Sequence, residues 1–128
     1  MKHENLTNLI IKAFYQVYNT LGFGFLEKVY ENAMRIELRQ MGLFVEQQKR
    51  INVYYNSELV GDYYADLEIN NVVILELKAH ENIIEEHENQ LVNYLKATEI
   101  EVGLLLNFGK KPEIKRKIFD NSKKVALR

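Results

Sequence analysis

Three charged residues near the middle of the chain, Asp66, Glu76 and Lys78, have types and spacing that suit hydrolytic chemistry. Two carboxylates brought within a few ångströms of each other repel unless a proton or a cation lies between them. In a chain without cysteine and without paired histidine spacing, oxygen ligands favour Mg²⁺ or Mn²⁺ over zinc. Lys78 would supply positive charge where negative charge gathers on a phosphorus centre, or would help to deprotonate an attacking water.

These three residues must be positioned by neighbouring strands. In a strand over Val72–Lys78, alternation places Glu76 and Lys78 on one face of the sheet. Asp66 lies on the preceding strand, and it can face Glu76 only if the antiparallel connection is three residues, Asn70 to Val72, or contains a bulge. A two-residue turn would put the two carboxylates on opposite faces. The alternative interpretation is a cross-strand ion pair between Glu76 and a basic neighbour, with Asp66 solvated.

Hydrophobic periodicity and turn residues predict the remaining elements. They are a helix over Leu6–Leu21, a helix over Phe25–Met41, strands over Phe44–Tyr55, Glu58–Ile69 and Val72–Lys78, a helix over Ile84–Ala97, a strand over Val102–Phe108 and a last helix from Pro112. Because a helix links the third and fourth strands, we expect them to be parallel. The predicted fold is an α/β domain over residues 1–128, with a mixed sheet flanked by helices.

The second predicted helix carries acidic residues on its apolar side. Glu27, Glu31, Met34 and Leu38 are spaced four, three and four apart, so both carboxylates should face inward or toward a cleft. Taken alone, Glu31 also fits an exposed helix charge, and Tyr30 also fits helix packing.

A polar stripe follows on the helix over Ile84–Ala97. His87, Gln90 and Tyr94 occupy positions i, i+3 and i+7, which places them beside the apolar stripe and lets them face one cleft. The structural alternatives are that Tyr94 is a core aromatic with a satisfied hydroxyl group, and that His87 is a surface residue or supports the site indirectly.

Together these motifs resemble the PD-(D/E)XK nuclease superfamily. The similarity extends over Leu21–Phe108. Within the superfamily, the sequence is most similar to a small branch that is named for a GxxExxY motif. The matching residues are Asp66, Glu76-Leu77-Lys78, Gly24, Glu27 and Tyr30 in GFLEKVYE, and His87, Gln90 and Tyr94 in HENQLVNYL. Ala65 replaces the proline of the superfamily name, and Tyr64 stands where related sequences often carry arginine.

The resemblance implies a restriction-endonuclease-like αβββαβ core over about 21–108, with an extra helix at each end. It also implies roles for individual residues. The implied metal ligands are the carboxylates of Asp66 and Glu76, the main-chain carbonyl of Leu77, and Glu27, which contacts the metal or its waters. The implied catalytic lysine is Lys78, supported by the QxxxY pair Gln90 and Tyr94. The expected cofactor is Mg²⁺ or Mn²⁺.

The charge distribution and composition of the chain indicate which partners and which cell compartment to expect. The chain carries a net charge of −1, but residues 110–128 hold eight basic and two acidic side chains, against nine and sixteen in residues 1–109. A basic tail could contact a phosphate backbone, and it equally fits a solvated terminal helix. The first twenty residues contain charges that interrupt the apolar run of a signal peptide, and the chain has no cysteine, so we expect a cytoplasmic protein without a membrane segment.

The leading hypothesis is a metal-dependent nuclease that hydrolyses phosphodiester bonds of nucleic acid, with DNA as the expected substrate and a 5′-phosphate product implied by the resemblance. The alternative is a catalytically inactive module that binds nucleic acid or protein. A phosphatase or nucleotide hydrolase ranks last, because no phosphate-binding glycine loop is present. The sequence leaves the oligomeric state open, although a homodimer would help so small a nuclease to engage both strands.

Overall fold

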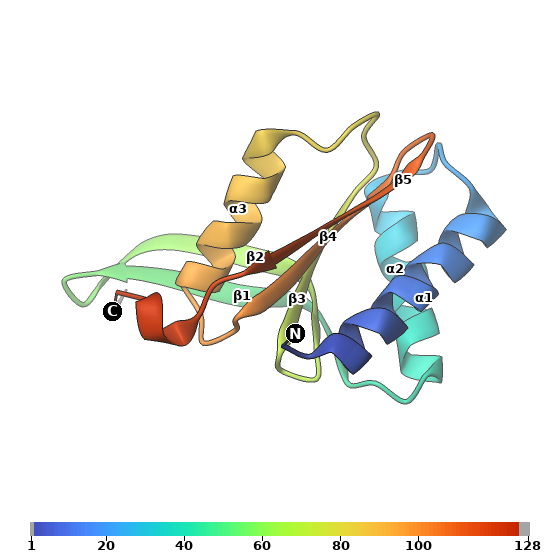
Figure 1. The fold of residues 1–128 in the computed structure, drawn as a ribbon. Helices are drawn as coiled ribbons and strands as arrows, with labels where there is room; N and C mark the ends of the chain where they lie inside the picture. The colour runs from blue at the N-terminus through green and yellow to red at the C-terminus, as the bar shows by residue number, and fades with distance from the viewer. Residues whose placement is uncertain (1, 126–128) are drawn as a thin grey trace.

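The computed structural model describes residues 2–125 and has two helices followed by a five-stranded sheet with one inserted helix (Figure 1). In chain order the elements are α1 (Glu4–Leu21), α2 (Glu27–Gln40), β1 (Val45–Tyr55), β2 (Glu58–Ile69), β3 (Val73–Lys78), α3 (Glu85–Lys96), β4 (Val102–Phe108), β5 (Pro112–Ile118) and the 3₁₀ turn η1 (Asn121–Lys123). The predicted bounds of the first three helices and four strands agree with these to within about two residues.

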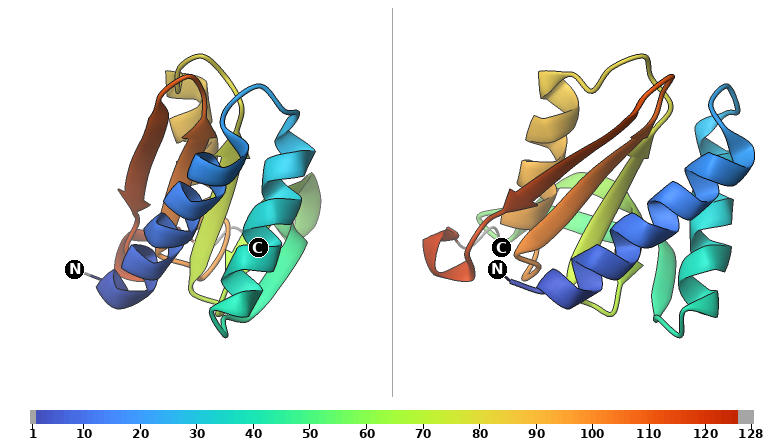
Figure 2. Two further views of the ribbon diagram at one scale, coloured as in Figure 1. Left: turned by 90° about the vertical axis from the view of Figure 1, so that its right-hand side faces the viewer. Right: turned by 45° about the vertical axis from the view of Figure 1, so that its right-hand side comes forward.

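The strands lie in the order β1-β2-β3-β4-β5, and only β3 and β4 are parallel. This confirms the predicted α/β class, the mixed sheet and the parallel crossover through α3, consistent with a restriction-endonuclease-like core. Helices α1 and α2 cover one face of the sheet, and α3 covers the other (Figure 2).

Strand β3 lies between the two apolar cores, and alternation divides its side chains between them. Val73, Leu75 and Leu77 pack with α1 and α2, whereas Ile74 packs with Leu91 and Leu95 of α3. Glu76 and Lys78 have the same parity as Ile74, so they belong to the α3 side of the strand. The central strand therefore delivers two charged residues toward the face that α3 covers.

The connection between β2 and β3 has the predicted length. Ile69 pairs with Val73, so Asn70, Asn71 and Val72 form the loop. Both asparagines adopt left-handed backbone conformations (φ 51° and 59°), which asparagine tolerates better than most residues. The amide of Val72 donates to the carbonyl of Ile69 at 3.0 Å and closes the turn. This register sets Asp66 level with Glu76.

The predicted C-terminal helix is wrong. Residues Pro112–Ile118 form strand β5, which pairs antiparallel with β4 along its whole length. Isoleucines at 114 and 118 are four residues apart, a spacing that puts them on one face of either a helix or a strand. The segment forms a strand and not a helix because β4 is buried on both faces, and the outer backbone edge of β4 needs a hydrogen-bonded partner.

Strand β5 is a charged edge strand. Lys115, Arg116 and Lys117 follow one another along it, and such charges discourage pairing with another sheet. Arg116 also holds the strand to the helical layer, because its guanidinium group donates to Oγ1 of Thr7 on α1 at 2.8 Å. The last basic residue of the predicted tail, Arg128, lies outside the described residues.

Candidate active site

The centre of the site is a junction between β2 and β3 in which side chains replace ladder hydrogen bonds. The amide of Asp66 donates to Oε2 of Glu76 at 3.1 Å, and the amide of Leu77 donates to Oδ2 of Asp66 at 2.8 Å. Regular pairing of the two strands reaches only to Leu67 opposite Leu75. Each carboxylate therefore binds the backbone of the opposite strand, and the two acids lie together.

Strand β1 is irregular at the same level. Gln48 has φ 53° and is the one position missing from the pairing between Gln47–Leu67 and Lys49–Ala65. Asp66 would be its partner, so β2 departs from regular pairing toward both neighbours at this residue. A local break of this kind frees a side chain from strict alternation and is common beside active sites.

Burial and mutual repulsion govern the ionisation of the two acids. Burial raises the pKa of Glu76 well above its usual range, and the charge of Asp66 raises it further. Burial also raises the pKa of Asp66, while hydrogen bonds from Glu76 and from the Leu77 amide oppose that rise. The charge of Lys78 lowers the pKa of both acids. Without a cation, the pair therefore holds a proton to higher pH than two separate acids would, mainly on Glu76.

Helix α3 brings Gln90 and Tyr94 to the same site. The side-chain amide of Gln90 donates to the hydroxyl oxygen of Tyr94 at 3.0 Å, which leaves the tyrosine's own proton for another acceptor. Tyr94 is buried, and burial followed by the charges of Glu76 and Asp66 raises its pKa to about 12. The hydroxyl group consequently stays protonated at neutral pH. Tyr94 is both a core aromatic and a member of the polar stripe.

His87 begins the same stripe and is buried, contrary to the surface interpretation. Its Nδ1 accepts the amide of Ile84 at 3.3 Å at the start of α3, and its ring centroid lies 4.7 Å from that of His80. Burial lowers the pKa of His87, and the charges of Lys78 and His80 lower it further. We infer that a neutral His87 holds the first turn of α3 in place.

The two acids of α2 occupy different environments: helix spacing predicted that both face inward or toward a cleft, and only Glu31 faces inward. Glu27 is the first residue of the helix, and its side chain keeps 45% of its surface exposed. Its Oε2 lies 3.4 Å from Nε2 of His80, in the segment that follows β3. Glu27 therefore lies at the end of β3 and interacts with His80, outside the hydrogen bonds that join Asp66 and Glu76.

Glu31, one turn further along α2, is the buried acid. It is 5% exposed, so the interpretation as an exposed helix charge is wrong. Its carboxylate accepts hydrogen bonds from the side chains of Lys28 at 2.8 Å and Gln48 at 2.9 Å, and from Gln47. The charge of Glu31 also raises the pKa of Asp66, so this acid contributes to the electrostatics of the carboxylate pair.

The glycine and tyrosine that flank Glu27 in sequence fix the loop between α1 and α2. Gly24 has φ 110°, a backbone conformation that residues other than glycine rarely adopt. The Tyr30 hydroxyl group donates to the carbonyl of Gly22 at 2.7 Å and accepts the amide of Phe25 at 3.2 Å. The Tyr30 ring stacks on Phe108 with centroids 4.2 Å apart. This tyrosine joins the loop to the core.

Sequence reasoning missed Asn107, a fully buried residue on β4. Its Oδ1 accepts the amide of His80, and its Nδ2 donates to the carbonyl of His80, both at 2.9 Å. The same Nδ2 donates to Glu113 at 3.0 Å. The sequence does contain one indication of this role: Asn107 is the only polar side chain in the apolar run of β4, and a buried polar side chain requires hydrogen-bond partners. Asn107 fixes the segment that leaves β3 after Lys78.

A family comparison decides how this geometry is classified. The model of the PD-(D/E)XK nuclease superfamily matches residues 4–117, which includes every helix and strand of the sheet domain except the last residue of β5. The chain belongs to the PD-(D/E)XK nuclease superfamily. No curated protein and no solved structure gives a significant match.

Superfamily members are typically metal-dependent nucleases, so the donor set of this PD-(D/E)XK domain can be tested for metal binding. Asp66 and Glu76 supply carboxylate oxygens, the donors that Mg²⁺ and Mn²⁺ prefer, and their raised pKa values indicate a site where a cation would relieve repulsion. Over residues 2–125, no cluster of three or more His, Asp or Glu side chains is arranged to hold a metal ion. Two carboxylates suit a Mg²⁺ or Mn²⁺ ion, which commonly keeps several of its waters.

Within residues 2–125, no helix combines the length and apolar character needed to cross a bilayer.

Proposed function

We propose that this PD-(D/E)XK protein is a Mg²⁺- or Mn²⁺-dependent nuclease that hydrolyses phosphodiester bonds, with DNA as its substrate, and that it belongs to the GxxExxY branch. The observation that carries the proposal is the pair of partly buried Asp66 and buried Glu76, adjacent on two strands, with Lys78 acting on both and Tyr94 approaching from the facing helix.

The proposed metal ligands are the carboxylates of Asp66 and Glu76 and the main-chain carbonyl of Leu77, with Glu27, the first residue of α2, contacting the metal or its waters. A bound divalent cation supplies Lewis acidity, activating a water and polarising the phosphate group. Because the two acids repel each other, loading of the site requires the pair to release its shared proton. Metal binding should therefore strengthen as pH rises.

The chain's own residues would orient the substrate and stabilise charge. Lys78 stands at the end of a buried strand, so its ammonium group is delivered by a rigid element, which is how preorganised charge is best supplied. The Tyr94 hydroxyl group remains protonated at neutral pH and can donate to a phosphate oxygen or to the attacking water, while Gln90 keeps it oriented.

Nucleic-acid binding would involve the end of the molecule where β3 and β4 finish. The β4–β5 turn lies there (Figure 1). It exposes Lys110 and Lys111, and the Tyr18 hydroxyl group fixes it from within hydrogen-bond distance of the carbonyls of Gly109 and Lys110, at 2.7 and 2.8 Å. Two ordered lysines beside the proposed site suit contacts to the phosphate backbone. We further propose that the protein acts in the cytoplasm.

The test is cleavage of labelled linear, circular and single-stranded DNA, and of matched RNA, with Mg²⁺, Mn²⁺ or EDTA. Glu76→Gln and Lys78→Ala should each reduce the rate by at least about 100-fold, since the first removes a proposed metal ligand and the second removes positive charge that acts on the reacting phosphate. Glu58→Gln and Lys12→Ala, exposed residues elsewhere, serve as matched controls.

Cleavage that survives in both site variants would overturn the proposal. Binding of DNA without cleavage under any metal condition would instead establish the alternative of an inactive binding module. Cleavage of RNA with sparing of DNA would correct the substrate while retaining the mechanism.

A further inference from the structure

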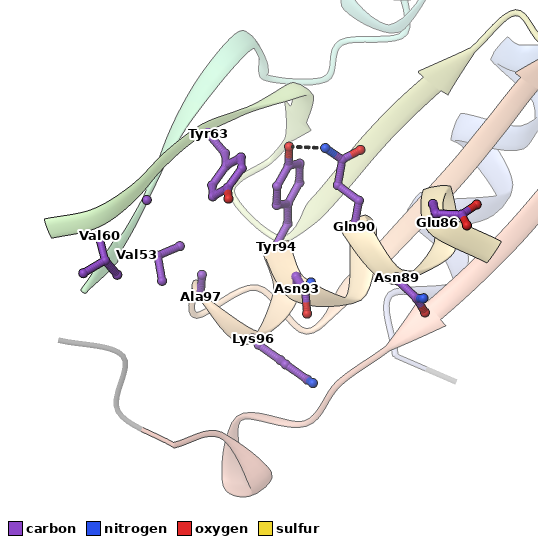
Figure 3. Close-up of a pocket in the computed structure, with 11 residues that line it drawn as sticks. Val53, Val60, Tyr63, Glu86, Asn89, Gln90, Asn93, Tyr94, Lys96 and Ala97 are labelled. Atoms are coloured by element: carbon purple, nitrogen blue, oxygen red, sulfur yellow. Dashed lines mark hydrogen bonds between the residues drawn. The ribbon is translucent and has the colours of Figure 1, made fainter. Parts of the chain in front are cut away.

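A pocket of about 580 Å³ lies between α3 and the β1–β2 hairpin, beside the proposed active site (Figure 3). Its volume falls within the range of about 300–1,000 Å³ that is usual for small-molecule sites. We propose that it binds an unpaired nucleobase of the substrate strand, so that the preferred substrate is single-stranded or frayed DNA. This inference rests on the proposed nuclease function and names its substrate class.

The hairpin side of the pocket offers an aromatic surface. The Tyr63 side chain lines the pocket and is 47% exposed, with its ring centroid 5.8 Å from that of Tyr94 at an angle of 46° (Figure 3). Val53 and Val60 continue the same wall. An exposed aromatic ring next to aliphatic side chains is the surface on which unpaired bases stack, at about 1–3 kcal/mol per base.

Gly61 determines where the Tyr63 ring can lie. A β-carbon at Gly61 would come within 2.9 Å of Cε2 of Tyr63 and 3.3 Å of the Val53 β-carbon. The ring therefore lies over the glycine, between the hairpin and α3. This position keeps the ring at the pocket instead of extended into solvent.

The opposite side of the pocket is polar without being basic. Asn89, Asn93 and Gln90 line it from α3 and present amide groups that both donate and accept hydrogen bonds. Glu86 and Lys96, one charge of each sign, complete this side. A phosphate group would need clustered positive charge, whereas a base is uncharged and carries donors and acceptors on its edge. The lining therefore favours a base over a phosphate.

The position of the pocket connects base binding to chemistry. Gln90 and Tyr94 line the pocket and also form the hydrogen-bonded pair at the candidate site, where the charges of Glu76 and Asp66 act on Tyr94. A strand whose phosphate approaches the carboxylates would therefore have an adjacent base within reach of Tyr63. A base inside an intact duplex is stacked and paired, so it must be released before it can enter.

The test measures binding in EDTA, where cleavage cannot proceed, by fluorescence anisotropy of a short labelled single-stranded DNA. Tyr63→Ala should weaken binding about 10-fold, the equivalent of about 1.4 kcal/mol of lost stacking, and Tyr63→Phe should retain it. Tyr64→Ala is the matched control, because Tyr64 is the next residue, is 46% exposed and is outside the pocket lining. A strand with abasic positions should bind weakly and should not respond to Tyr63→Ala.

Equal losses for Tyr63→Ala and Tyr64→Ala, or an equal loss on the abasic strand, would overturn the base pocket. The two proposals fail separately. Cleavage that is as fast on intact duplex as on single strands, and unaffected by Tyr63→Ala, would reject the pocket and leave the nuclease standing. Tyr63-dependent binding without cleavage under any metal condition would retain the pocket and reject the nuclease.

Discussion

Replacing Tyr30 with phenylalanine tests whether the GxxExxY motif fixes the loop that leads into α2. Tyr30→Phe retains the ring, and therefore the stack on Phe108, but removes the hydroxyl group. That group makes two hydrogen bonds, to the carbonyl of Gly22 and from the amide of Phe25. Because the ring volume is unchanged, the variant opens no large cavity in the core.

The two lost hydrogen bonds set the expected magnitude. A neutral hydrogen bond contributes about 0.5–1.5 kcal/mol, and both of these are partly buried, so the free energy of unfolding should fall by about 1–3 kcal/mol. With a urea slope of about 2 kcal/mol per molar, the midpoint should move down by about 0.5–1.5 M. The slope itself should not change, since both proteins bury the same surface.

Two measurements check this expectation. Urea unfolding gives the global loss, and amide hydrogen exchange at Phe25 reports the loop directly, because that amide loses its acceptor in the variant. Tyr15→Phe on α1 is the control, since Tyr15 is 40% exposed and its change should stay within about 0.5 kcal/mol. If Tyr30→Phe stays within the same limit and the Phe25 amide exchanges at the original rate, the hydroxyl group does not fix the loop.

Three further predictions concern the carboxylate pair and the sheet. Because folding raises the pKa of Glu76, the native protein should lose stability as pH rises from the unfolded pKa near 4.5 through the folded pKa. In urea titrations with EDTA, Glu76→Gln should therefore be the more stable protein at pH 8, and the difference should close toward pH 4.5. A stability difference that is independent of pH would contradict this. Mg²⁺ at 100 times its Kd should add about 2.7 kcal/mol to the native protein, measured as a rise in Tm, with little rise for Glu76→Gln. Gly103→Ala should cost about 1–3 kcal/mol in urea, because the new β-carbon would lie 2.6 Å from Cδ1 of Leu91; an unchanged midpoint would show that Leu91 moves freely.

The part of the site that local pattern determines was predictable from sequence. Alternation along β3 puts Glu76 and Lys78 on one face whatever the rest of the chain does. The requirement that Asp66 meet Glu76 predicted either a three-residue loop or a bulge, and the structure has the three-residue loop, Asn70 to Val72. Helical spacing likewise predicted that Gln90 and Tyr94 share a side of α3, where they are hydrogen-bonded. These inferences depend only on the side-chain periods of a strand (2 residues) and a helix (3.6 residues), which can be read from a short segment of sequence.

Features set by tertiary contacts were not predictable in the same way. Glu27 and Glu31 lie one turn apart on α2, and periodicity alone cannot tell that the first sits at the exposed helix start and the second against Gln48. The strand at Pro112–Ile118 was missed because its isoleucine spacing fits both periods, and the unpaired edge of β4 decided between them. Both outcomes follow from a neighbouring element, not from the segment itself.

The carboxylates of Asp66 and Glu76 each accept a hydrogen bond from the backbone of the strand that carries the other acid, and this affects the stability of any variant of either acid. Each side chain secures the strand that carries the other, so deletion of one acid also withdraws the support that positions its companion. The double deletion should cost less than the two single deletions added together, as expected for groups that behave as one cooperative unit. Amide replacements, which keep an acceptor for the opposing N–H group, will separate loss of charge from loss of this junction, whereas alanine removes both at once.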